Sequence, residues 1–273
     1  MTVTLITGCS SGIGFAAALE FARRGHTVVA TMRHPERADG LNAALIGAGV
    51  TADVRALDVA DDASVVASVA AVLADHGRID VVVSNAGIGI DGTTEELSLD
   101  DFRASFETNV LGSVRLLQAV LPTWRAAGGG RFVAVSSVAG VVGQPFNDAY
   151  CTSKFALEGL LESLAPVVAQ HGIHVSLVEP GPVAGDFAHK HGPPAGRNVG
   201  PYAESRARFQ VVQDGGYAVA QTNQEIAALL ADVAEAETPM LRYQTSEMVS
   251  KMLGLKIKDM SGERVIGMTS RWI

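Results

Sequence analysis

The chain has 273 residues, of which 48% are hydrophobic, and its 29 acidic and 21 basic side chains give a formal net charge of -8 at pH 7. This length and apolar content predict one α/β domain, residues 1–273, with a sizeable core. The acidic balance, without a lysine or arginine cluster, argues against nucleic acid or an anionic membrane as the partner, so we expect a small ligand.

Two cysteines, Cys9 and Cys151, provide neither a disulfide framework nor a zinc spacing. The chain enters a strand without a signal-type segment, and no apolar run has the length of a membrane span. We therefore expect a cytoplasmic protein without stable membrane insertion.

The first elements predict a phosphate-binding turn. Val3–Thr7 is a β-prone run, a glycine-rich stretch from Gly8 to Gly14 follows it, and residues 15–23 have a helical pattern. A strand, a glycine turn and a helix aim backbone N–H groups at a phosphate, although G-x-x-x-G-x-G departs from the general fingerprint and a tight connection is the alternative. The residues assigned to cofactor binding here are Gly8, Ser10, Ser11, Gly12, Ile13 and Gly14.

Strands and helices then alternate along the chain. Strand patterns recur at 27–32, 52–57, 79–84, 131–136 and 174–179, and helical patterns lie between them at 38–46, 63–74, 100–126 and 150–170. Alternation of this kind predicts right-handed βαβ units, and hence a doubly wound parallel sheet of the Rossmann type in a three-layer αβα arrangement.

Several polar residues follow these strands and are assigned to the cofactor. Arg33 comes after the second strand, where an arginine can meet the extra phosphate of NADP, with Ser11 adding a hydroxyl; a solvated surface arginine is the alternative. Asp58 and Val59 close the third strand, where Asp58 either accepts a hydrogen bond from adenine or belongs to the cap of the next helix. Asn85, Ala86 and Gly87 end the fourth strand, and Asn85 holds neighbouring strand ends together, contributes to the cofactor floor, or does both.

The pattern over 100–126 predicts one long helix that begins after the cap residue Ser98. Asn109 lies on its buried side and needs hydrogen-bond partners, which are either backbone groups alone or a water in a proton path.

Ser137, Tyr150 and Lys154 form the candidate catalytic group. Ser137 follows the buried run 132–135, and open α/β sheets place their sites at the carboxyl ends of strands. Tyr150 and Lys154 are separated by one helical turn, so the ammonium is expected to lower the pKa of the phenol and suit it to acid–base work at a carbonyl or alcohol. The alternative is an exposed lysine beside a half-buried aromatic. Gly143 is assigned to the substrate together with Ser137 and Tyr150.

The remaining chain predicts a cover and an extension. Residues 183–222 form a polar substrate lid, and residues 246–273 form a C-terminal extension in which methionines line a pocket wall or a subunit contact. His189 and His191 lack an acidic third ligand, so no metal is expected.

In these residues the sequence resembles the short-chain dehydrogenase/reductases from Val3 to about Val183. The resemblance rests on Thr7-Gly8-x-x-x-Gly12-x-Gly14, Asn85-Ala86-Gly87, Asn109, Ser137, Tyr150-x-x-x-Lys154 and Pro180-Gly181. Within the family, the stretches 145–151 and 153–160 and Leu241-Arg242-Tyr243 are most similar to the estradiol 17β-dehydrogenase and retinol dehydrogenase group. The usual threonine after Pro180-Gly181 is replaced by Gly185-Asp186, and no histidine matches the one that contacts the far end of a steroid.

The resemblance implies a proton donor or acceptor at Tyr150, a substrate contact at Ser137, and a lysine, Lys154, that tunes the tyrosine and holds the nicotinamide ribose. Asn109 would position a water, and Pro180, Gly181 and Val183 would contact the cofactor. We therefore expect an NADP(H)-preferring oxidoreductase, with NAD possible, that interconverts a 17β-hydroxysteroid and its ketone. The alternatives are an enzyme of another hydrophobic alcohol or carbonyl, such as a retinoid or polyketide, and a non-catalytic NADP sensor. The family also implies a homodimer or homotetramer.

Overall fold

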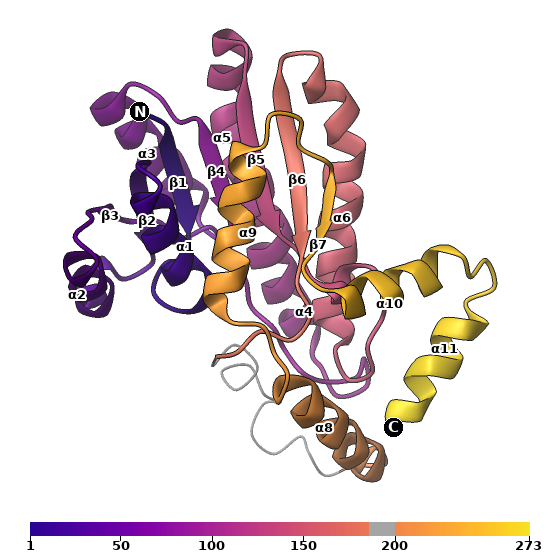
Figure 1. Ribbon diagram of the computed structural model, residues 1–273. Helices are drawn as coiled ribbons and strands as arrows, with labels where there is room; N and C mark the ends of the chain where they lie inside the picture. The colour runs from indigo at the N-terminus through magenta and orange to yellow at the C-terminus, as the bar shows by residue number, and fades with distance from the viewer. Residues whose placement is uncertain (186–199) are drawn as a thin grey trace.

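Seven parallel strands form one sheet in the order β3-β2-β1-β4-β5-β6-β7, and helices cover both of its faces (Figure 1). The computed structural model describes residues 1–185 and 200–273. This topology confirms the predicted doubly wound αβα fold. The strands are β1 (Val3–Thr7), β2 (Thr27–Met32), β3 (Asp53–Ala56), β4 (Val81–Ser84), β5 (Gly130–Val135), β6 (Ile173–Glu179) and β7 (Arg242–Gln244).

The two faces of the sheet bury different halves of each strand, because successive side chains of a strand point to opposite sides. In β5, Val133 and Val135 pack with α1 (Gly12–Arg23), α2 (Asp39–Gly47) and α9 (Asn223–Glu235). Phe132 and Ala134 pack on the other side with α3 (Asp62–His76), α5 (Gly112–Ala127) and α6 (Asp148–Ala169). The central strands are therefore apolar throughout, as the sequence indicates.

One predicted helix is wrong in its form. The segment expected as a single helix over 100–126 consists of α4 (Leu99–Phe106), a π-helical turn (Glu107–Leu111) and α5. Ser98 begins α4 in a reciprocal capping box with Asp101, as its sequence predicts. The π turn contains Asn109, and such turns inside helices are frequent at functional sites.

The elements after residue 199 were not predicted in detail. They are α8 (Ala203–Tyr217), α9, β7, α10 (Glu247–Ile257) and α11 (Glu263–Thr269). Helix α8 lies beyond the carboxyl ends of the strands, and α10 and α11 lie beside it (Figure 1). Part of the expected lid, residues 186–199 with His189 and His191, is outside the described residues.

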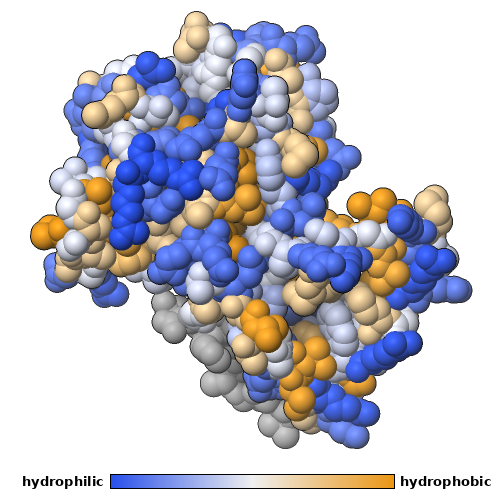
Figure 2. Space-filling view, viewed as in Figure 1, coloured by the Kyte–Doolittle hydropathy of each residue, from blue (hydrophilic) through white to orange (hydrophobic). Residues whose placement is uncertain are grey.

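Aromatic rings join α8 to its neighbours. The ring centroids of Phe146 and Phe209 are 5.6 Å apart, and those of Phe209 and Trp272 are 6.3 Å apart. Exposed apolar side chains also gather over α8 and α10 (Figure 2). Val211 on α8 and Ile257 on α10 are both 72% exposed. Within the described ranges, no helix has the length and apolar content needed to cross a membrane.

Candidate active site

The glycine turn after β1 leaves room on one side and contacts the sheet on the other. Gly8 and Gly12 have φ of 74° and 63°, a region that favours glycine. A Cβ on Gly14 would lie 2.4 Å from both Asn85 Nδ2 and Gly8 O, so the turn can close only on a glycine. A Cβ on Gly12 would meet only Asn223 Oδ1, at 3.7 Å. The turn is therefore held tightly on the side of Asn85 and open on the side of Gly12.

Thr7 and Asn85 hold this turn against the end of β4. Asn85 Nδ2 donates to Thr7 O at 2.8 Å, and the backbone N–H groups of Asn85 and Ala86 both donate to Thr7 Oγ1 at 3.0 Å. Of the two alternatives for Asn85, the bond between neighbouring strand ends is thus present.

The first turn of α1 lies at this opening, and its N–H groups have no acceptor within the helix. Ser11 is exposed and occupies the cap position without a side-chain cap hydrogen bond. Ser10 is also exposed, and Ile13 is half-buried. A helix N-terminus that no side chain caps is a ready anion site.

Arg33, Asp58 and Val59 follow β2 and β3 on the same edge of the sheet. Arg33 is exposed and forms no ion pair within the part of the chain that the structure describes. Asp58 Oδ1 accepts from the backbone N of Ala60 at 3.0 Å, and Asp61 rather than Asp58 caps α3. The Val59 side chain is buried in the core, and its backbone carbonyl accepts from Arg115 Nη1 at 3.1 Å.

Ser137 and Tyr150 meet at the carboxyl end of β5. Ser137 Oγ accepts from the backbone N of Ala139 at 3.1 Å, which orients the hydroxyl at the start of a short 3-10 helix, Val138–Gly140. A hydrogen bond joins the Ser137 and Tyr150 hydroxyls. The two groups expected to act on one substrate oxygen are therefore adjacent.

The pKa of Tyr150 differs from the expectation. Burial raises it above the usual value for a phenol, and this effect outweighs the hydrogen bond from Ser137, which lowers it. The expected lowering by Lys154 is therefore not found in the protein alone. Lys154 Nζ lies 5.7 Å from the Tyr150 ring centroid and donates to Val135 O at 2.8 Å, so its charge is partly directed to the backbone.

Lys154 is itself strongly perturbed. It is 4% exposed, and burial lowers its pKa to about 8, while the charge of Glu158 acts in the opposite direction. A buried ammonium with few partners is costly, and such perturbed groups cluster at functional sites.

Asn109 places the π turn beside Lys154. Its Oδ1 accepts from Ile88 N at 2.8 Å, and its Nδ2 donates to Ile88 O at 2.8 Å and to Ser153 Oγ at 2.9 Å. A Cβ on Gly87 would lie 3.1 Å from Asn109 Oδ1 and 3.8 Å from Lys154 Nζ. The side chain thus has backbone and hydroxyl partners, and the amide and the lysine converge on Gly87.

A second group of side chains near Tyr150 was not singled out from the sequence. Tyr217, at the end of α8, adds its charge to the burial that raises the pKa of Tyr150. Burial also raises the pKa of Tyr217, and the charge of Asp91 adds to this effect. Burial raises the pKa of Asp91 to about 6, although Arg206 opposes this. These residues come from segments far apart in sequence, so no local pattern could have linked them.

Arg206 anchors α8 to the loop that precedes α6. Its guanidinium carbon lies 4.5 Å from the Phe146 ring centroid, and its Nη2 donates to Glu96 Oε2 at 2.6 Å. Phe146 has φ of 60°, which is uncommon for a residue with a side chain, and its carbonyl accepts from Gly92 N at 2.6 Å. Gly143, in the same loop, is exposed with open space around it.

The segment after β6 packs between the Ser137 turn and α10. Pro180 O accepts from Val138 N at 2.8 Å, and a Cβ on Gly181 would lie 3.0 Å from Val249. Val183 forms a bridge with Gln221. Pro180 and Gly181 therefore link the Ser137 turn to α10.

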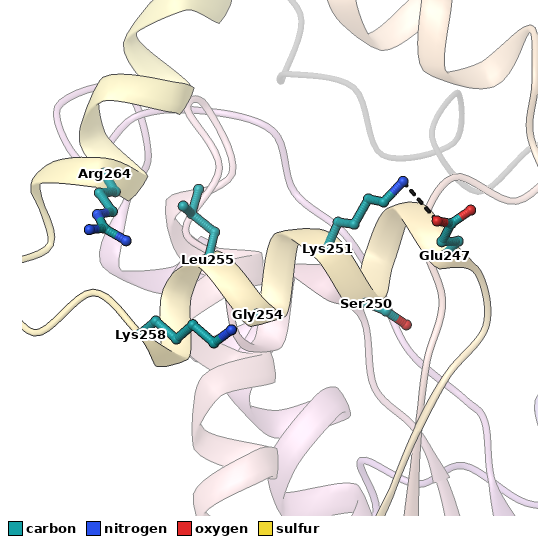
Figure 3. Close-up of a pocket in the computed structure, with 7 residues that line it drawn as sticks. All are labelled: Glu247, Ser250, Lys251, Gly254, Leu255, Lys258 and Arg264. Atoms are coloured by element: carbon teal, nitrogen blue, oxygen red, sulfur yellow. Dashed lines mark ion pairs between the residues drawn. The ribbon is translucent and has the colours of Figure 1, made fainter.

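A separate pocket of about 480 Å³ lies at α10 and α11 (Figure 3). Lys251 and Glu247 point toward one another across one end, with Nζ and Oε1 2.8 Å apart. Lys258 and Arg264 lie at the other end. No residue of the candidate catalytic group lines this pocket, so it is not the place of the chemistry. In the described ranges, no group of metal-ligating side chains comes together either.

Known proteins similar to this chain agree with the geometry. The family model described as short chain dehydrogenase matches residues 2–195. Human 17-beta-hydroxysteroid dehydrogenase type 1 is 39% identical over 97% of this chain and 84% of that protein. Human retinol dehydrogenase 8 is 38% identical over 98% of this chain and 88% of that protein.

Solved structures extend the comparison. A short-chain dehydrogenase from Streptomyces avermitilis has a TM-score of 0.83 and 33% identity, covering 99% of this chain and 95% of its own. A metagenomic short-chain oxidoreductase solved in complex with NADP has a TM-score of 0.70 and 28% identity, covering 89% and 96%. The motif matches, the sheet order and these similarities lead to one conclusion: the chain belongs to the short-chain dehydrogenase family and is an oxidoreductase that acts on alcohol groups.

Proposed function

We propose that this protein is an NADP(H)-preferring dehydrogenase that interconverts a secondary alcohol and a ketone on a bulky apolar substrate, of the 17β-hydroxysteroid type. The observation that carries the proposal is the meeting of Ser137, Tyr150, Lys154 and Asn109 at the carboxyl end of the sheet, beside an open glycine turn.

The residues at the turn fit a dinucleotide. The space above Gly12 and the uncapped start of α1 suit a pyrophosphate, and the exposed Ser11 and Arg33 suit an additional ribose phosphate. Gly14 supports this fit, because its missing Cβ lets Asn85 hold the turn closed. Ala86, Gly87, Asp58, Val59, Pro180, Gly181 and Val183 are proposed as the further contacts. When bound, the nicotinamide exchanges a hydride with the carbon that carries the substrate oxygen.

The side chains of this protein manage the proton and the charge on oxygen. Ser137 donates a hydrogen bond to the substrate oxygen, and Tyr150 gives that oxygen a proton in reduction or takes it in oxidation. Lys154, when cationic, stabilises the phenolate and makes up for the burial that raises the pKa of Tyr150. Asn109 fixes the backbone at Ile88 and Gly87 next to the lysine.

Similarity to the steroid and retinol enzymes supports a large apolar substrate. The aromatic contacts of Phe146, Phe209 and Trp272 provide an apolar support for α8 at this end of the molecule. We propose that the segment 183–222 covers the substrate, with Gly143 at its edge, and that the extension 246–273 contributes a wall.

The test follows the absorbance of reduced nicotinamide with estradiol, retinol and simple secondary alcohols, each with NADP and with NAD. Tyr150→Phe is expected to lower kcat by about 10²–10⁴ without loss of cofactor binding, because it removes the proton donor but keeps the ring. Full turnover in this variant would disprove the mechanism.

Arg33→Ala is expected to weaken NADP and leave NAD unaffected, which tests the phosphate contact separately. Turnover of retinol or other alcohols but not estradiol would favour the second candidate, a dehydrogenase of another hydrophobic alcohol. NADP binding without turnover of any substrate would favour a sensor.

A further inference from the structure

Two buried carboxyl groups lie near Lys154, and the mechanism proposed above gives them no role. Glu158 belongs to α6, one helical turn after Lys154, and is 5% exposed. Glu179 is the last residue of β6 and is 0% exposed. Ionised carboxylates are rarely buried so deeply unless their charge and their hydrogen bonds are matched.

One guanidinium is shared between them. Arg242 Nε donates to Glu158 Oε2 at 2.9 Å and lies 3.4 Å from Glu179 Oε1. Arg242 Nη2 also donates to Oε2 of the exposed Glu162 at 2.6 Å. Gln244 Nε2 donates to Glu179 Oε2 at 2.6 Å. Arg242 therefore contacts three carboxylates, and its single positive charge cannot neutralise both of the buried ones.

The second oxygen of each buried carboxyl group lacks a donor if both groups are ionised. Glu158 Oε1, Glu179 Oε1 and Ser136 Oγ are buried, and among the described residues they find no well-aligned hydrogen-bond partner outside their own group. Within the group, the Glu179 carboxyl lies within hydrogen-bond reach of Glu158, and Glu158 lies within hydrogen-bond reach of Ser136. A proton on one carboxyl satisfies both carboxyl oxygens at once, since the acid can donate to its neighbour.

We propose that Glu158 and Glu179 hold a single proton between them, and that the negative charge left on this acid pair, one turn from Lys154, keeps the catalytic lysine protonated. The two glutamates are positioning residues in this scheme, and it rests on the role proposed above for Lys154.

The pKa shifts of the two glutamates and of Lys154 are consistent with a shared proton. Burial raises the pKa of Glu179 to about 7, with the charge of Glu158 adding to it, and burial also raises the pKa of Glu158. The charge of Glu158 raises the pKa of Lys154 against its burial. The other ionisable groups nearby are Tyr150 and Glu162 on α6 and Arg242 on β7. Glu247 and Lys251 on α10 are exposed and pair with each other.

The charge effect is tested by pH profiles of kcat/KM between pH 6 and 10. Glu158→Gln removes the charge nearest Lys154, so the loss of activity at alkaline pH is expected to move about one pH unit lower. Glu179→Gln leaves the single negative charge on Glu158, the carboxylate nearer Lys154, so no shift to lower pH is expected in that variant. The control is Glu162→Gln, which removes the exposed partner of the same arginine and should leave the profile in place. Coincident profiles for Glu158→Gln and Glu162→Gln would overturn the influence on Lys154.

The shared proton is tested without enzyme activity. Infrared spectra at pH 6 are recorded in an Asp91→Asn background, because Asp91 is itself partly protonated at this pH. The carbonyl band of a buried carboxylic acid should be present with the wild-type pair and in Glu162→Gln, and it should be lost in Glu158→Gln and Glu179→Gln. Its absence with the wild-type pair would disprove the acid pair. If the enzyme turned over no alcohol, the proposed function and the link to Lys154 would fall, while this band would still decide the state of the pair.

Discussion

At the scale of single residues, Lys154 combines a proposed catalytic role with a cost to stability. Burial lowers its pKa to about 8, which means that the fold opposes the charged form that stabilises a phenolate. A lysine with an ordinary pKa of 10.5 in the unfolded chain is charged there at pH 7, so folding loses about 3 kcal/mol at this position.

Replacing Lys154 should therefore separate stability from activity. Lys154→Met keeps the length of the side chain and removes the charge, but leaves Val135 O without its donor, which costs about 1 kcal/mol. The variant is expected to gain about 2 kcal/mol in the free energy of unfolding at pH 7 and to lose most of its turnover. Denaturant unfolding at pH 7 and pH 10 measures this. The gain should shrink as the pH rises from 8 to 10.5, because the folded lysine is then already neutral; an equal gain at both pH values would contradict it.

Asp91 gives a second prediction with the opposite pH dependence. Its pKa rises from 3.8 to about 6 on folding, so the wild type loses stability as the pH rises through this window. Asp91→Asn removes that loss. Its thermal midpoint should exceed that of the wild type at pH 7 and approach it at pH 4, where the carboxyl is protonated in the folded state. A difference that does not depend on pH would show that Asp91 is not buried as a charge.

At the scale of elements, α8 depends on a small number of polar anchors. Arg206 joins it to Glu96 and to the Phe146 ring, and Tyr202, just before the helix, donates to Glu95 Oε2 at 2.7 Å. Few buried apolar residues hold the helix, since Phe209 is its one fully buried side chain. An element with this balance is expected to open locally before the sheet unfolds.

The anchor is tested by comparing two arginines of α8. Arg206→Met should increase amide hydrogen exchange across residues 203–217 and raise KM for a bulky substrate more than it lowers kcat. Arg208→Met is the matched control, because among the described residues Arg208 pairs with Glu204, one turn away on the same helix. Equal exchange in both variants would show that the ion pair with Glu96 does not hold α8.

Elements whose pattern is local could be predicted from the sequence, and those that depend on distant partners could not. The limits of β1 and β2 match the expected strands, since five or six apolar or β-branched residues in a row determine them. The π turn at Asn109 was missed because its hydrogen bonds reach Ile88 and Ser153. Strand β7 is short and exists through its pairing with β6, in which Arg242 lies beside Leu177. The candidate catalytic residues were proposed from their motif, whereas Asp91, Arg206 and the partners of Glu158 became visible only in three dimensions.

At the scale of the whole molecule, apolar side chains remain exposed on the helices that the family resemblance pairs across a two-fold axis. They are Leu99, Leu111, Phe155 and Val167. A symmetric interface uses the same patch twice, so α4, α5 and α6 are the proposed contact of a homodimer or of a tetramer built from such dimers.

One substitution on this face tests the assembly. Val167 is 59% exposed on α6, and Val167→Glu would place two like charges near the axis of a dimer. Light scattering at micromolar concentration should give at least a dimer for the wild type and a smaller mass for the variant. Ile46→Glu, at a residue of α2 that is 78% exposed, serves as the control and should leave the mass unchanged. A monomeric wild type would refute the proposal.

The position of α9 limits how this chain can be shortened. The helix covers α1 with Ile226, Leu230 and other buried residues, and Arg24 pairs with Asp232 and Glu235 to join the two helices at their edge. The family match ends at residue 195, before α9 begins. A fragment cut at that boundary would keep every catalytic motif yet expose the apolar side of α1, so it is expected to aggregate. The segment that carries the motifs thus ends before α9, whereas the segment expected to fold must include it.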